Sequence, residues 1–192
     1  MSDRVRVVYF SDSPWVGGAE RYLHLLAAHL PRDGFEPLAI VNGGERLDPL
    51  RRWMRESGIE VVDSALDLPR SARGIGSFVR AIRASRADIL HCNLPGPWGA
   101  QYGLVAPLAR LAGARAVVST EHLPMVPSFA KGRLVKSAAT LAIDRVITVS
   151  EDNVGHLVRN HRVPRSKIRV VLNGVPDPPP VSRERVRAAL GA

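Results

Sequence analysis

The sequence contains a single cysteine, Cys92, and this scarcity sets the first limits on the protein. One cysteine cannot form a disulfide within the chain, and it suits a reducing compartment. No activating partner is evident near Cys92, so we expect a small core residue rather than a nucleophile. The N-terminus lacks the apolar segment of a signal peptide, and no stretch approaches the roughly 18 apolar residues of a membrane span. A cytoplasmic protein is therefore expected.

Aromatic residues and lysines are also few. Aromatic residues make up 5% of the chain, and arginine carries most of the net charge of +9, because the lysines are limited to Lys131, Lys136 and Lys167. The basic residues are scattered and no nucleic-acid-binding motif accompanies them, which argues against nucleic acid as a partner. The charge favours phosphorylated substrates or anionic lipids, unless it only reflects a GC-rich coding sequence.

Two common cofactor signatures are missing as well. Gly17 and Gly18 do not continue as G-x-G-x-x-G, which argues against a nicotinamide or flavin cofactor. There is no Asp-x-Asp metal signature, and Asp63 and Asp67 are too far apart to form one. We therefore predict a protein without a bound cofactor that works independently of a metal.

The order of apolar segments predicts an α/β fold. Short runs rich in Val and Ile alternate with stretches of helical periodicity, which is typical of a doubly wound, Rossmann-like, mostly parallel sheet with helices on both faces. Seven strands are predicted, at residues 5–10, 37–41, 59–62, 88–92, 116–120, 145–149 and 168–172. Six helices are predicted between them, at residues 19–30, 46–57, 72–85, 98–112, 128–143 and 151–160.

The first strand–loop–helix unit holds the clearest ligand-binding signal. Gly17 and Gly18 stand where the first helix begins, so its unpaired N–H groups and positive dipole end would face the loop. Such a place suits a phosphate or another anion, and glycine allows close approach. The alternative is a tight turn in which the glycines serve only a positive φ.

The other candidates follow from the loops at the carboxyl ends of the strands, where ligands bind in such sheets. His122 follows the fifth strand and is the strongest candidate among the histidines. His91 ends the fourth strand, either as an acceptor contact or as a buried ring with its hydrogen bonds satisfied. The remaining four are expected to have structural or surface roles: His24 and His29 as helix-surface or packing residues, and His156 and His161 as exposed residues.

The chain changes character after residue 172. Residues 173–181 read NGVPDPPPV, and four prolines in nine residues predict a stiff linker. We therefore divide the chain into a Rossmann-like domain, 1–172, and a linker with the start of a helix, 173–192.

Five segments resemble one family. The segments GGAERYLHLLAAHL, DILHCNLPG, VVSTEHLP, VITVSEDN and KIRVVLNGVP occur in the order found in the family 4 glycosyltransferases, retaining enzymes of the GT-B fold. The resemblance covers only their N-terminal, acceptor-side half. The C-terminal half of that family supplies the main nucleotide-sugar pocket with a Glu-x7-Glu pair, and no such pair occurs here.

The resemblance implies roles for particular residues. His122 would be the catalytic-site histidine beside the donor sugar, and Asn173 with Gly174 would start the interdomain hinge. The residues expected to bind the donor phosphate or substrate are Gly17, Gly18, Asn93, Glu121, Ser150 and Glu151.

The implied function is transfer of a hexose from a UDP- or GDP-linked donor to a hydroxyl of a small-molecule, glycan or lipid-linked acceptor. The isolated chain is expected to be inactive, since one wall of the cleft is missing. The alternatives are a binding module for a sugar or phosphorylated ligand, and half of a sugar-nucleotide epimerase. Residues 125–136 mix apolar and basic side chains, which suggests either peripheral contact with an anionic membrane or an ordinary loop and amphipathic helix.

Overall fold

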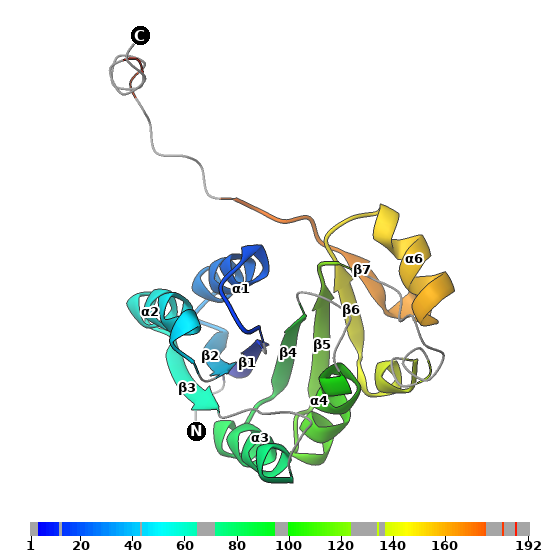
Figure 1. Cartoon of the computed structure of the whole chain (residues 1–192), viewed down its shortest axis with the longest axis horizontal. Helices are drawn as coiled ribbons and strands as arrows, with labels where there is room; N and C mark the ends of the chain where they lie inside the picture. The colour runs from blue at the N-terminus through cyan, green and yellow to red at the C-terminus, as the bar shows by residue number, and fades with distance from the viewer. Residues whose placement is uncertain are drawn as a thin grey trace.

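The computed structural model describes residues 4–11, 13–42, 44–64, 72–94, 100–123, 134, 137–175, 182 and 187. Seven strands form one sheet in the order β3-β2-β1-β4-β5-β6-β7 (Figure 1). All six neighbouring pairs are parallel, so the sheet is entirely rather than mostly parallel over these residues. The strands are β1 (Val5–Ser11), β2 (Phe35–Asn42), β3 (Glu60–Ser64), β4 (Ile89–Leu94), β5 (Ala116–Glu121), β6 (Arg145–Thr148) and β7 (Ile168–Val170).

Helices cover both faces of the sheet, as the sequence predicts. The α-helices are α1 (Gly18–Ala28), α2 (Asp48–Glu56), α3 (Ala72–Ser85), α4 (Ala100–Leu111) and α6 (Asp152–His161). Short 3₁₀ turns are η1 (Glu45–Leu47), η2 (Thr140–Ala142) and η3 (Arg165–Lys167). In Figure 1, α1 and α2 lie on the opposite side of the sheet from α3 and α4.

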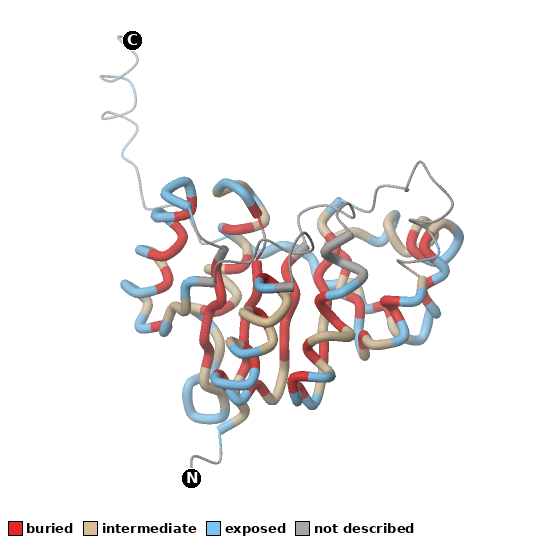
Figure 2. The backbone as a smooth tube through the Cα atoms, turned by 60° about the horizontal axis from the view of Figure 1, so that its bottom comes forward, coloured by how far each residue is buried: buried red, intermediate tan, exposed pale blue. Residues whose placement is uncertain are grey.

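Side-chain alternation along β1 shows why two helical layers form. Val7 and Tyr9 belong to an apolar cluster with side chains of α1 and α2, whereas Val8 and Phe10 belong to a second cluster with α3 and α4. Successive side chains of a strand point to opposite faces, so a run of apolar residues needs cover on both. Leu157 of α6 joins the second cluster. Figure 2 shows the resulting band of buried residues along the strands.

Two aspartates secure the amino ends of the strands. Asp88 precedes β4, and its carboxylate accepts the backbone N–H of Arg6 in β1 at 2.9 Å. Asp144 precedes β6, and its carboxylate accepts the backbone N–H of Val117 in β5 at 2.7 Å and pairs with Arg110. Each aspartate therefore connects the strand it precedes to a neighbouring strand.

Some predicted elements differ from those observed. β7 ends at Val170 rather than at residue 172, and Val171 and Leu172 continue without regular structure. Half of the helix predicted at 128–143, most of the segment 125–136 and nearly all of 176–192 lie outside the described residues; at the end of that helix, 137–139 are helical and η2 follows. The proposed boundary at 172/173 thus stays a prediction.

Candidate functional site

The strand register brings three polar side chains together at the carboxyl edge of the sheet. Ser11 of β1 pairs with Asn93 of β4, and Asn93 pairs with Thr120 of β5. All three residues are completely buried. Asn93 lies within β4 rather than in the loop after it, where the sequence pattern placed it. Its side chain is therefore held between two neighbouring strands on the face covered by α1.

His122 is anchored to this row immediately after β5. Its Nε2 lies 2.9 Å from Asn93 Oδ1, and Asn93 Nδ2 donates to the Ala19 carbonyl at 3.0 Å. The ring of Tyr22, from α1, packs against the half-buried imidazole at a centroid distance of 4.9 Å and an interplanar angle of 80°. The first turn of α1, the end of β4 and the end of β5 thus meet at one imidazole.

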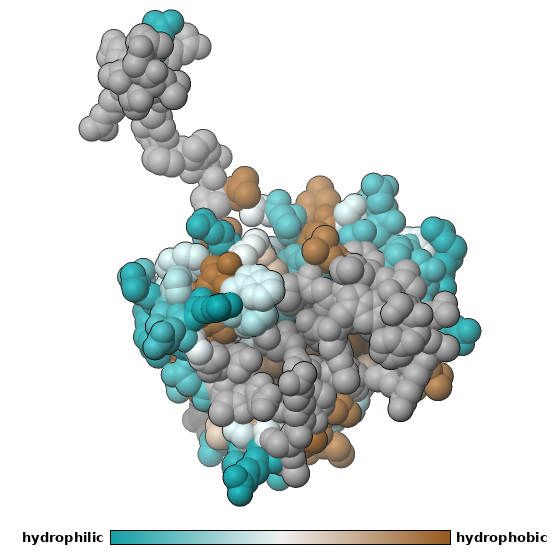
Figure 3. Space-filling view, in the orientation of Figure 1, coloured by the Kyte–Doolittle hydropathy of each residue, from teal (hydrophilic) through white to brown (hydrophobic). Residues whose placement is uncertain are grey.

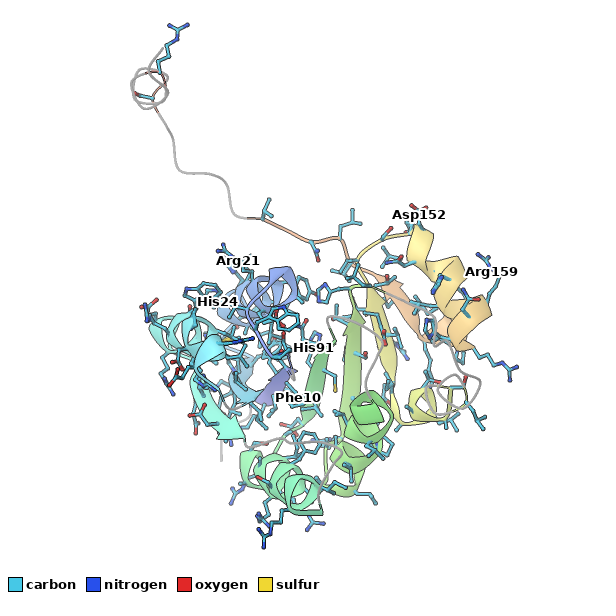
Figure 4. The ribbon with its side chains drawn as sticks, viewed as in Figure 1. Phe10, Arg21, His24, His91, Asp152 and Arg159 are labelled. Atoms are coloured by element: carbon cyan, nitrogen blue, oxygen red, sulfur yellow. The ribbon has the colours of Figure 1, made fainter. Side chains whose placement is uncertain are left out.

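His91 lies one pleat deeper and is a buried ring with a hydrogen bond. His91 Nε2 is 2.7 Å from Thr120 Oγ1, and the Tyr9 ring lies 5.3 Å away. Figure 4 shows His91 between α1 and the sheet. Of the two alternatives for His91, the buried structural ring is the one observed.

Burial controls the protonation of these rings. Desolvation and, to a smaller extent, the nearby His122 together lower the pKa of His91 to about 4. Desolvation also lowers the pKa of His122, although the charge of Glu121 offsets part of this effect. Burial raises the pKa of Tyr22, with partial compensation from the Thr120 hydroxyl. Burial therefore favours the neutral form of both imidazoles.

Gly17 and Gly18 do not adopt a conformation reserved for glycine. Gly17 has φ −137° and ψ −161°, and Gly18 is not among the described glycines with positive φ. A Cβ added at Gly18 would meet nothing within 4 Å, and one at Gly17 would meet Glu20 Oε2 at 3.4 Å, an ordinary contact. The alternative of a turn that needs positive φ is therefore wrong.

The side chain of Glu20 caps the N-terminus of α1. Its carboxylate is buried, and it accepts the backbone N–H of Gly17 at 2.9 Å and the Ser11 hydroxyl at 3.3 Å. A carboxylate at this position also interacts favourably with the positive end of the helix dipole. The Gly17 N–H that we expected to face a phosphate is thus donated to Glu20 in this structure.

The remaining candidates lie around the same edge. Glu121 ends β5 and is buried, with the Ser119 hydroxyl 3.4 Å from its Oε1. Ser150 follows β6 and accepts the backbone N–H of Asp152 at 3.2 Å, while Glu151 is exposed. Within the part of the chain that the structure describes, no hydrogen bond joins Ser150 or Glu151 to His122 or Asn93.

Asn173 and Gly174, the predicted hinge, are exposed residues without regular structure beyond β7. Beside them, an apolar groove of about 290 Å³ lies between α1 and the segment after β7. It is lined by Tyr22, Leu25, Leu26, His29, Val171, Leu172, Gly174 and Val175. In Figure 3, hydrophobic side chains are visible near where the chain leaves this rim. Tyr22 thus separates the groove from His122.

The other four histidines differ in how well their predicted exposure agrees with the structure. His24 packs beside Trp53 and bonds the Ser57 hydroxyl at 2.9 Å, and His29 is exposed, both as predicted for helix-surface or packing residues. The prediction for His161 is wrong, because this residue is completely buried, and His156 is half-buried beside it. His161 follows Leu157 by four residues, so both face the core side of α6.

Three further residues contact this site and were not predicted from the sequence: Glu20, Tyr22 and Thr120. The spacing of Gly17 and Glu20, a helix cap followed three residues later by Glu, could have indicated Glu20. Tyr22 and Thr120 carry no local signal, because their importance depends on contacts between distant segments.

Over the described ranges, the chain has neither a cluster of metal-ligating side chains nor a membrane-spanning helix. No group of three or more His, Cys, Asp or Glu side chains there could hold a metal ion. No helix in the same residues is both long and apolar enough to cross a bilayer. Metal independence itself stays a prediction.

The fold and the polar edge define a doubly wound α/β domain with a candidate ligand site at the carboxyl ends of its strands. The family model Glycosyltransferase Family 4 matches residues 16–177, and the chain therefore belongs to this family. It forms an N-terminal GT-B domain. No curated protein matches the chain significantly.

Solved structures share the fold at low sequence identity. A glycosyltransferase from Rickettsia africae matches with a TM-score of 0.78 and 19% identity, over 99% of this chain and 49% of that one. The UDP-GlcNAc 2-epimerase from Neisseria meningitidis, bound to UDP-GlcNAc, matches with a TM-score of 0.57 and 10% identity, over 87% and 45%. The UDP-GlcNAc 2-epimerase from Methanocaldococcus jannaschii matches with a TM-score of 0.54 and 12% identity, over 88% of this chain and 45% of that one. The chain thus spans about half the length of the structures it resembles.

Proposed function

We propose that this chain is the acceptor-side half of a retaining glycosyltransferase that moves a hexose from UDP- or GDP-hexose to a hydroxyl acceptor. The observation that carries the proposal is the glycine pair at the start of α1. Neither the backbone conformation nor packing within the chain requires Gly17 and Gly18 to be glycine. Close approach of something outside the chain explains both, and a helix N-terminus favours a phosphate there.

The position of His122 supports the same reaction. Its neutral imidazole lies beside the first turn of α1, linked to Ala19 through Asn93. A ring in this place can hydrogen-bond a hexose hydroxyl while the diphosphate lies against the glycine loop. His122 would then position the sugar rather than act as a strong base.

The proposed chemistry needs only groups that the protein and substrates supply. The bond from the anomeric carbon to the diphosphate oxygen breaks, and the acceptor oxygen bonds to that carbon on the same face. The acceptor's proton passes to a departing phosphate oxygen. Backbone N–H groups and the dipole of α1 stabilise the leaving negative charge, without a metal or another cofactor.

A second, donor-binding half of the protein would complete the site. Leu172 and Val175, next to the proposed hinge at Asn173 and Gly174, are 72% and 85% exposed. Such apolar residues at the rim suit coverage by a donor-binding half, and Ser150 with Glu151 would close against it. The isolated chain is then inactive. We also propose that the whole protein works in the cytoplasm, with peripheral membrane contact where the acceptor is lipid-linked, and without nucleic acid.

The test is turnover of UDP- and GDP-hexoses by the native protein, purified from its own cells, beside the 192-residue chain. The native protein should release nucleoside diphosphate in the presence of a hydroxyl acceptor and yield a product of retained configuration. Gly18→Ala should lower this turnover about 10- to 100-fold, because a methyl group displaces the donor phosphate. Gly34→Ala is the matched control, since Gly34 is exposed and a Cβ there also meets nothing within 4 Å.

Each alternative has a distinct outcome in this experiment. An epimerised sugar nucleotide without transfer identifies an epimerase half. Tight binding of a free sugar or phosphorylated ligand by the 192-residue chain, without turnover by the native protein, identifies a binding module. Equal turnover by Gly18→Ala and Gly34→Ala overturns the assignment of the glycine pair.

A further inference from the structure

Asn93 is oriented by a partner that can accept but not donate a hydrogen bond. Asn93 is completely buried. The end of its amide that lies 3.0 Å from the Ala19 carbonyl oxygen must be the NH₂ group, because a carbonyl oxygen can only accept a hydrogen bond. The other end of the amide, the oxygen, is then turned toward His122 Nε2 at 2.9 Å. The Ala19 carbonyl therefore decides which end of the amide His122 meets.

An amide oxygen facing a ring nitrogen requires that nitrogen to carry the hydrogen. His122 Nε2 is consequently the donor of this bond. In a neutral imidazole the second nitrogen, Nδ1, then carries the lone pair. Burial, which lowers the pKa of His122, favours the neutral ring.

The surroundings hold this arrangement in place. Asn93 lies between Ser11 and Thr120 in the sheet register, and both neighbours are completely buried. Tyr22 packs edge-to-face against the His122 ring. The glycine loop and the imidazole are thus joined through one amide whose two ends are not interchangeable.

We propose that Asn93 is a positioning residue that holds His122 as the Nε2–H tautomer, so that Nδ1 acts as a hydrogen-bond acceptor in the candidate site. The ligand it selects is a hydroxyl donor, such as a hexose hydroxyl, and this part of the inference rests on the proposed function. Asn93 itself does not touch the substrate; it acts through His122.

The experiment is long-range ¹H–¹⁵N NMR of the chain labelled with ¹⁵N-histidine, near neutral pH. His122, assigned by the signal lost in His122→Gln, should show a protonated Nε2 and a bare Nδ1. Asn93→Leu removes the acceptor, and the His122 signals should shift toward a mixture of both tautomers. Ser57→Ala is the control, because it removes the partner of His24 and should leave His122 unchanged.

Asn93→Asp is a second test variant, which can be used if the backbone amide spectrum shows that Asn93→Leu does not fold. An aspartate still offers an acceptor to Nε2, so the Nε2–H tautomer should persist while the added negative charge raises the pKa of His122. The other titratable groups around this ring, Tyr22 on α1, His91 on β4 and Glu121 on β5, are unchanged in the variant. If Asn93 served only for packing, the Nε2–H tautomer would not persist in the Asp variant and be lost in the Leu variant.

The inference is overturned if wild-type His122 carries its hydrogen on Nδ1, or if Asn93→Leu leaves the tautomer as it was. Neither result depends on catalysis. Loss of the proposed function would instead be seen as absent turnover by the native protein while the Nε2–H tautomer is present.

Discussion

The two ends of the central strands use polar residues in different ways. At the amino ends, Asp88 and Asp144 each accept a backbone N–H from another strand, and each pairs with an arginine at or near the surface. At the carboxyl ends of β1, β4 and β5, completely buried Ser11, Asn93 and Thr120 bond to neighbouring side chains and to the first turn of α1.

Residues that stabilise the fold and residues of the proposed site thus lie at opposite ends of the strands. At the amino ends, the carboxylates of Asp88 and Asp144 accept backbone N–H groups of neighbouring strands and so stabilise the sheet. The carboxyl ends bury polar side chains that apolar residues could replace with less risk to stability. Here the buried network joins His122 to the first turn of α1 in a defined arrangement, as the proposed site requires. Substitutions at the two ends should therefore have opposite effects on activity and stability.

The largest expected effect is on activity and comes from the carboxyl end. His122→Ala in the native protein should lower kcat/KM for the nucleotide sugar about 100- to 1,000-fold, the range found for loss of one positioned site group. Initial-rate kinetics measure this, with thermal unfolding as the check on folding. Asp144→Ala is the comparison from the amino end, and its kcat/KM per folded molecule should stay within about twofold of wild type. A large loss in both variants would erase the contrast between the ends.

The next effect is on stability against pH and depends on His91. Its pKa is lowered to about 4 in the fold, so between pH 6.5 and 4 the unfolded chain binds a proton that the folded chain does not. The free energy of unfolding should therefore fall as pH drops through this window, by about 3 kcal/mol from this residue. His122 and His24, whose pKa values are also lowered, contribute in the same direction.

Urea unfolding at several pH values measures this slope. His91→Gln should make the slope shallower between pH 6.5 and 4, because the variant has no group to protonate at position 91, while the contributions of His122 and His24 stay. His29→Gln, a change at an exposed histidine on the same side of the sheet, should leave the slope unchanged. A slope that is as steep in His91→Gln as in wild type would show that His91 is not the group responsible.

A smaller loss of stability is expected at the amino end. Asp144→Ala removes the acceptor for the Val117 N–H and the partner of Arg110. Because the aspartate is 44% exposed, we expect about 1 to 2 kcal/mol of lost unfolding free energy. Asp88→Ala should behave alike, and Asp33→Ala, in an exposed turn, should cost less than either. Equal losses in all three variants would count against a special role for the strand-linking aspartates.

The sequence predicts the architecture well for a physical reason. Apolar runs of strand length that alternate with amphipathic stretches fit few folds other than a parallel sheet covered on both faces. The order of strands and helices also predicts that His122 and the glycine pair lie at the carboxyl edge of the sheet, where the structure has them; that this edge binds the ligand stays a prediction. Both predictions depend on patterns within a single segment.

The contacts within the site could not be predicted in the same way. Asn93 meets His122 because of the register between β4 and β5, and no local pattern sets the pairing of strands so far apart. His161 was expected to be exposed at the end of its helix, but α6 turns this residue inward together with Leu157. Side-chain partners across the fold depend on packing rather than on periodicity.

The smallest expected effect concerns Glu20, which caps α1 at the place where we propose that the donor phosphate binds. Its carboxylate satisfies the Gly17 N–H and lies at the positive end of α1, the place proposed for the donor phosphate. Glu20→Gln keeps an oxygen for this N–H while removing the charge, at a cost of about 0.5 kcal/mol from the helix dipole. The native protein carrying this change should show a KM for the nucleotide sugar lowered a few-fold, with kcat little changed, because repulsion between two anions is gone. Glu56→Gln, at the exposed far end of α2, is the matched control and should leave KM unaltered. An unchanged or raised KM in Glu20→Gln would mean that the phosphate does not share the start of α1 with this carboxylate.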